Sequence, residues 1–162
     1  MKKEDPVEAS KPRSLLADTC LEETVRLAYH RFGPSRDLRG QAPSFKAKLD
    51  AAEVQIEAIQ LTEWRVMAQL SKGASPGPES SIMKNLGADI GQLLTELMVE
   101  AIGLYSCPDQ SQLPNPIDSN TSIGPTEGNK AFERYFNYRA SSIAGGTNEV
   151  QKNIVAKLVL GL

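Results

Sequence analysis

Two adjacent glycines near the end of the sequence, Gly145 and Gly146, stand directly before Thr147, Asn148 and Glu149. Glycine allows a backbone to adopt positive φ or to come close to a ligand. A threonine or asparagine at the start of a helix caps free N–H groups, and the same groups can hold an anion. The pattern therefore predicts a corner suited to a phosphate or a ribose. An ordinary helix junction with a capping threonine is the simpler interpretation of these residues alone.

The single histidine, His30, limits the other chemistry that the sequence could support. A di-iron site in a helical bundle needs Glu-x-x-His on two helices, and no glutamate stands three residues before His30. A Ser–His–Asp or Cys–His arrangement would need the same histidine, and no glycine-flanked nucleophile accompanies it. We therefore expect no metal site and no hydrolase activity, and we place His30 in solvent at a helix end.

Two groupings of aromatic and basic residues suggest ligand binding at first sight. Trp64 beside Arg65 could stack on a planar ring, but the spacing of the apolar residues around it favours burial of Trp64 in the core. Arg134 and Arg139 stand beside tyrosines, as in a nucleic-acid-binding strip. Lys and Arg total 18 against 20 Asp and Glu, so the chain has no basic excess to support such binding. We expect a solvated helix face there and no nucleic-acid partner.

Apolar residues at steps of three and four predict helices throughout, separated by loops rich in glycine and proline. The helices are expected at residues 15–32, 44–72, 78–105, 129–142 and 147–160, with a long loop at residues 106–127. Gly87 and Gly91 lie inside the third helix, where we expect them to allow close contact with another helix. No segment has the alternation of a strand. The sequence thus predicts an all-α fold, an up-down four-helix bundle with a short additional C-terminal helix.

The remaining composition indicates where the folded domain begins and which cellular compartment suits the chain. Residues 1–12 are charged and contain prolines, so we expect a disordered leader or a remnant of cloning, with the bundle in residues 13–162. Hydrophobic residues make up 40% of the chain, which is enough for a core. Cys20 and Cys107 form no C-x-x-C pair and suit a reducing compartment. No apolar run reaches transmembrane length. We expect a soluble protein without a membrane partner, in the cytoplasm or, in a eukaryote, in the mitochondrial matrix.

The string IAGGTNEVQKNIVAKLVLGL at 143–162 resembles the C-terminal signature of acyl-CoA dehydrogenases, flavoenzymes that desaturate acyl-CoA thioesters between Cα and Cβ. The resemblance continues upstream through PGPESSIMK at 76–84 and ELMVEAIG at 96–103, and it covers residues 14–162. It implies the C-terminal helical domain of that family, which is a four-helix bundle that assembles with itself as a dimer or tetramer.

The resemblance also implies a cofactor and particular site residues. Thr147 and Glu149 would contact the ADP-ribose part of FAD, with the backbone of Gly145 and Gly146 close by. The complete enzyme would act on an acyl-CoA substrate and pass electrons to an electron-transfer flavoprotein. Many family members carry their catalytic glutamate immediately before the Gly-Thr pair, where this chain has Gly145, so no catalytic residue is assigned. Tyr29 stands where the family's Arg-x-x-Phe-Gly motif has its arginine.

The family's other two domains, which hold the flavin ring and most of the acyl-CoA, would lie upstream of this sequence. We therefore expect the chain to bind FAD weakly or not at all by itself, and to lack desaturase activity alone. An alternative from a different functional class is a noncatalytic helical bundle that assembles with itself or with a partner dehydrogenase. The sequence leaves open the acyl chain length, the catalytic base and the oligomeric state.

Overall fold

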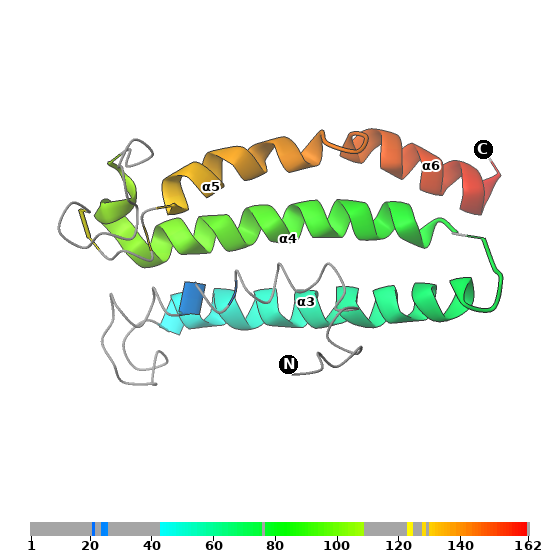
Figure 1. Cartoon of the computed structure of the whole chain (residues 1–162), viewed down its shortest axis with the longest axis horizontal. Coiled ribbons are helices and arrows are strands. Elements are labelled where there is room, and N and C mark those ends of the chain that lie inside the picture. The colour runs from blue at the N-terminus through cyan, green and yellow to red at the C-terminus, as the bar shows by residue number, and fades with distance from the viewer. Residues whose placement is uncertain are drawn as a thin grey trace, which may run out of the picture.

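Three helical rods lie side by side in the part of the chain that the computed structural model describes (Figure 1). The described residues are 21, 24–25, 43–75, 77–108, 123–124, 128 and 130–161. The rods are α3 (Pro43–Leu70), α4 (Glu79–Ile102) and a third rod made end to end of α5 (Ala131–Tyr138), the 3₁₀ helix η4 (Arg139–Ser142) and α6 (Asn148–Leu160). α4 lies between the other two rods and runs antiparallel to both. Because the described residues are helical and contain no strand, the predicted all-α fold is confirmed.

The boundaries of α4 follow from residues that the sequence analysis identified. Pro78 precedes the helix, and Glu79 lies in its first turn, where a carboxylate favours the positive helix end. The helix ends at Gly103, whose N–H still donates to the Val99 carbonyl in the helical pattern and whose φ of +65° turns the following chain out of the helix. The short 3₁₀ helix η2 (Gly103–Ser106) then completes the segment that was predicted as the end of one long helix.

Several predicted segments lie outside the described residues. The first predicted helix, 15–32, is described only at Leu21, Thr24 and Val25, all three of which are helical. Thr24 is buried, and the other two pack against the core. The leader at 1–12 and most of the loop at 106–127 are outside as well, so the predictions for them stay predictions. The same holds for Cys20, Tyr29 and His30.

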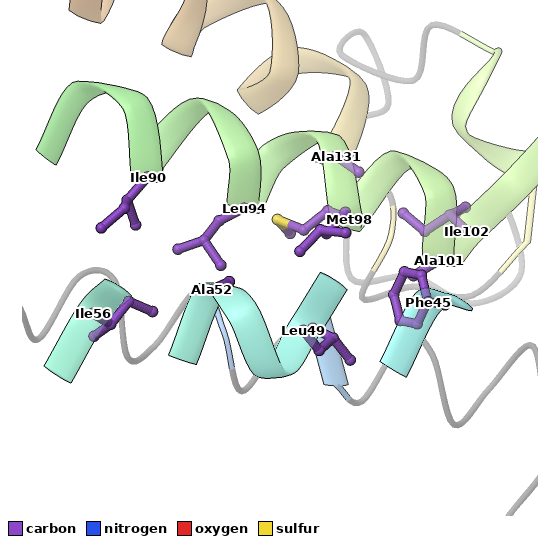
Figure 2. Packing of buried hydrophobic residues seen from close by; sticks show 11 residues of the cluster. Phe45, Leu49, Ala52, Ile56, Ile90, Leu94, Met98, Ala101, Ile102 and Ala131 are labelled. Atoms are coloured by element: carbon purple, nitrogen blue, oxygen red, sulfur yellow. The ribbon is translucent and has the colours of Figure 1, made fainter. Parts of the chain in front are cut away.

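The core lies between α3 and α4 (Figure 2). One face of each helix contributes apolar side chains at steps of three and four, as helical periodicity requires. Burial of such a side chain stabilises the fold by roughly 1.5–3 kcal/mol relative to leaving it in water. The buried cluster consists of Phe45, Leu49, Ala52 and Ile56 from α3, Ile90, Leu94, Leu97, Met98, Ala101 and Ile102 from α4, and Ala131 from α5.

Trp64 lies outside the core face of α3 and is exposed to solvent, so the predicted burial of this residue is wrong. Its side chain is 55% exposed, and that of Met67 is 59% exposed. From Ile59, the helical period leads to Glu63 and Val66, which are both half-buried. The step of five residues from Ile59 to Trp64 instead rotates the indole by about 140° around the helix axis, off the core face.

A close helix contact joins α4 to the third rod at Gly91. A Cβ atom built on Gly91 would lie 2.7 Å from Cε1 of Tyr138, so a residue with a side chain at this position would force the tyrosine ring to shift. The prediction of close contact is confirmed for Gly91. For Gly87 it is wrong as far as the described residues go, since a Cβ there would meet no atom of another described element within 4 Å.

We predict that Leu94→Ala lowers the free energy of unfolding by about 2–5 kcal/mol, because it removes a side chain that is only 1% exposed from the centre of the α3–α4 core. Leu104, which is 87% exposed, provides the matched control, and Leu104→Ala should change the same quantity by less than about 0.5 kcal/mol. Urea unfolding followed by circular dichroism measures both values. Equal effects of the two substitutions would contradict the assignment of the core.

Candidate functional site

The glycine corner, residues Gly145 to Glu149, joins η4 to α6. Gly145 and Gly146 both adopt positive φ, +71° and +97°, which L side chains rarely adopt. Thr147 is extended, with φ −62° and ψ 157°, and α6 begins at the next residue. The predicted interruption of the helix at the two glycines and the predicted helix start at Thr147 are therefore confirmed. Apart from its chain neighbours, no described atom lies within 4 Å of a Cβ built on Gly145, so the described part of the chain leaves the backbone there uncovered.

The hydroxyl of Thr147 caps α6. Its Oγ1 accepts a hydrogen bond of 3.3 Å from the Val150 N–H, one of the donors that the first turn of a helix leaves free. The side chain of Gln151 bonds back to the turn, because its Nε2 donates to the Gly145 carbonyl at 3.0 Å. The corner therefore has a defined conformation that its own residues support.

Hydrogen bonds to the Glu149 carboxylate hold its pKa below the ordinary value of a glutamate. The largest cause is a hydrogen bond from its own backbone N–H, followed by one from the Thr147 side chain. The charges of Lys152 and Lys84 act in the same direction, and desolvation opposes them. The hydroxyl of Thr147 thus serves Glu149 as well as Val150 when no ligand is bound.

Four polar side chains tie the corner to the N-terminal half of α4. The ammonium group of Lys84 donates to Asn148 Oδ1 at 2.9 Å and to the Ser142 carbonyl at 3.3 Å. Asn148 Nδ2 donates to Asp89 Oδ1 at 3.4 Å, and Asn85 Nδ2 donates to the Asn148 carbonyl at 3.3 Å. Asn85 Oδ1 is buried and finds no partner among the described residues. The sequence analysis assigned no role to these α4 residues, since no local spacing relates position 84 to position 148.

Arg139 does not lie on the solvated face that was predicted for it. Its guanidinium donates to the Glu96 carboxylate at 2.8 Å, to the Gln92 carbonyl at 3.0 Å and to Thr95 Oγ1 at 3.3 Å. It also lies over the Tyr135 ring, 4.6 Å from the ring centre. These hydrogen bonds join η4 to α4. Arg139 therefore helps to hold the third rod, which carries the glycine corner, against α4.

Three further observations on the described residues concern metal ligands, a free thiol and the membrane. No three His, Cys, Asp or Glu side chains gather there in a way that could hold a metal ion. The thiol of Cys107 is free and exposed. None of the helices in these residues is both long and apolar enough to cross a membrane.

Comparisons with known proteins agree with this architecture. The family described as acyl-CoA dehydrogenase, C-terminal domain, matches residues 14–160, and the chain belongs to that family. Its fold is similar to that in the crystal structure of the ChsE4-ChsE5 complex from Mycobacterium tuberculosis, with a TM-score of 0.66 and 21% sequence identity. The similarity covers 92% of this chain but 36% of that chain, so this chain spans little more than a third of its length. No curated protein sequence matches the chain.

We predict that Thr147→Val raises the pKa of Glu149, because the substitution removes a hydrogen-bond donor from the ionised carboxylate. The pKa should stay below its ordinary value, since the stronger backbone hydrogen bond persists. Thr147→Ser keeps the hydroxyl and should titrate like the wild type. Carbon-detected NMR titration of the Glu149 carboxyl measures all three values, and identical values for the valine and serine variants would contradict the contact.

The lowered pKa of Glu149 also makes the free energy of unfolding depend on pH. The contribution of the Glu149 carboxylate is present above its unfolded-state pKa and is lost as the pH falls through the lower folded-state value. The effect is small, because this side chain is exposed to solvent.

Proposed function

We propose that this chain is the C-terminal domain of a flavin-dependent acyl-CoA dehydrogenase, and that its glycine corner contacts the ADP-ribose part of FAD. The observation that carries the proposal is the exposed, positive-φ turn of Gly145 and Gly146 at the capped start of α6. Membership of the family supports the parent activity. FAD would supply the acceptor for the hydride removed from the acyl chain.

The residues of the corner fit the two kinds of group in an ADP-ribose. The positive end of α6 and the N–H groups of its first turn favour a phosphate oxygen. The Glu149 carboxylate would repel a phosphate but can accept hydrogen bonds from ribose hydroxyls. A ligand that takes the Thr147 hydroxyl as donor must replace its contact to Glu149. We therefore orient the ribose toward Glu149 and the pyrophosphate toward the helix start.

The proposal gives the chain itself no catalytic residue. Gly145 stands at the place of the glutamate base of many relatives, and a glycine can accept no proton. A few contacts at one end of a cofactor rarely offset the entropy lost on binding, so of the two expectations, weak binding or none, we propose weak binding that only millimolar FAD makes visible. The flavin ring, the acyl-CoA and an electron-transfer flavoprotein would engage other parts of the complete enzyme.

Self-assembly is the second part of the proposal, and it is supported by a face of α3 that points away from the core. Val54 and Leu61 on this face are 66% and 58% exposed. An exposed row of residues runs along this face at alternating steps of four and three. This is the spacing at which two helices pack along each other. The row consists of Ala47, Ala51, Val54, Ala58, Leu61, Arg65 and Ala68.

Small residues in such a row let another helix approach closely, and six of its seven members are apolar residues whose joint exposure to water is unfavourable. We therefore propose that α3 carries the contact between copies of the chain. The same surface would serve the alternative function, in which the chain is a noncatalytic subunit that assembles with a partner dehydrogenase. The two functions differ in whether the corner binds FAD.

We predict that FAD at millimolar concentration shifts the amide NMR signals of Gly145 to Val150 and leaves those of α3 unchanged. FMN shares a phosphate with FAD but lacks the adenosine and its ribose, so it should shift the same signals less than FAD does. The double substitution Thr147→Val and Glu149→Ala should abolish the response to FAD without changing thermal stability by more than a few degrees, because both side chains lie outside the core. Equal responses to FAD and FMN, or no response of the corner to either, would refute the site.

We predict that Val54→Asp together with Leu61→Asp lowers the association constant of the chain by at least about tenfold, because the carboxylates would be desolvated in a helix–helix contact. Leu104→Asp introduces a charge at another exposed leucine and should leave association unchanged. Sedimentation velocity at several concentrations measures the association. A wild-type chain that stays monomeric at high concentration would contradict this part of the proposal.

A further inference from the structure

We propose that Lys84 of α4 is a positioning residue for the glycine corner: its ammonium group joins the two ends of the turn and thereby sets the direction in which α6 begins. The nature of the ligand rests on the proposed function above. The contacts that carry the inference are present in the ligand-free chain, so they can be tested separately.

The two acceptors of Lys84 lie on either side of the turn. Ser142 is the last residue of η4, and its carbonyl accepts from Nζ at 3.3 Å. Asn148 is the first residue of α6, and its Oδ1 accepts from the same atom at 2.9 Å. One charged group therefore spans the segment that contains Gly145 and Gly146. Because glycine has wide backbone freedom, this segment needs a restraint from outside to keep one conformation.

The side-chain amide of Asn148 is fixed between opposite charges. Its oxygen accepts from the Lys84 ammonium, while its nitrogen donates to the Asp89 carboxylate at 3.4 Å. Hydrogen bonds to charged groups are stronger than those between neutral groups. Asn85 adds a donor to the Asn148 carbonyl, so α4 holds both the side chain and the backbone of the residue that opens α6.

Contacts within the turn do not replace this restraint. The Ala144 N–H bonds to the Ala140 carbonyl, and the Gln151 side chain bonds to Gly145, so these bonds connect the turn only to its own flanks. They preserve the local shape but leave the turn free to rotate as a unit relative to α4. The contacts of Lys84, Asn85 and Asp89 remove that freedom.

The placement of a lysine here also has an electrostatic consequence. A positive charge close to the positive end of a helix is unfavourable in itself, and the Asp89 carboxylate offsets it in part. An anionic ligand at the start of α6 would reduce the same repulsion. Lys84 therefore both orients the corner and favours a phosphate-bearing ligand over a neutral one.

The test compares Lys84→Met, which removes the ammonium group, with Lys84→Arg, which can still donate to both acceptors. Lys152→Met removes the same charge from an exposed position of α6 and serves as the matched control. In Lys84→Met, the amides of Val150 and Gln151, whose N–H groups bond to Thr147, should exchange with solvent about tenfold faster than in the wild type, as expected for losing a charge-assisted hydrogen bond. Amides in the α3–α4 core should exchange at unchanged rates. The NMR response of the corner to millimolar FAD should shrink in the same variant, and Lys84→Arg should restore both properties.

Unchanged exchange in Lys84→Met, or an equal acceleration in Lys152→Met, would overturn the inference. Faster exchange with a full response to FAD would also overturn it, because the restraint would then be irrelevant to binding. If Lys84→Met fails to fold, Asn148→Ala removes the same bridge at its other end and should give the same local acceleration. A wild-type corner that does not respond to FAD would count against the proposed function, while the exchange rates would still decide whether Lys84 holds the corner.

Discussion

The packing of α4 is the constraint on which the rest of the structure depends. This helix contacts α3 on one side and α5, η4 and α6 on the other, so the described rods are placed relative to one another through it. Its α3 side is apolar, and Leu94, Leu97 and Met98 on it are almost completely removed from water. Once hydrophobic burial fixes α4 against α3, the residues on its other side stand at fixed positions and can receive the third rod.

The two sides of α4 use different interactions, and the difference bears on the candidate site. The third rod contributes only Ala131 to the buried cluster of the described residues, and no residue of α6 is fully buried. It is held instead by the contact of Tyr138 with Gly91 and by polar groups such as Arg139 and Lys84. Elements with few buried apolar contacts open at lower free energy than the core. The third rod is therefore expected to open at a lower free energy than the α3–α4 core. Hydrogen bonds from α4 hold the glycine corner in its position on that rod.

The exposed groups of the chain agree with a domain that acts together with other parts. The corner offers a capped helix start, an open glycine backbone and one carboxylate, which together could contact one end of a nucleotide cofactor but could not enclose it. The outer face of α3 presents a row of small and apolar residues to solvent. Gly145 adopts a positive φ, a backbone conformation that residues with a side chain rarely adopt.

The sequence by itself determined the helical class and the boundaries of α4 and α6, because apolar periodicity, prolines and glycines act over a few neighbouring residues. The family was indicated by the resemblance of the string at residues 143–162 to a known signature. The sequence also determined the local chemistry of the corner, since Thr147 caps a donor only three residues away. It did not determine the surroundings of Trp64, where a step of five residues misplaced the apolar stripe. The partners of Arg139 and Lys84 could be decided only by the tertiary structure. Lys84 and Asn148 are separated by 64 residues, and they meet because packing against α4 sets the register of the third rod, a quantity that no local pattern contains.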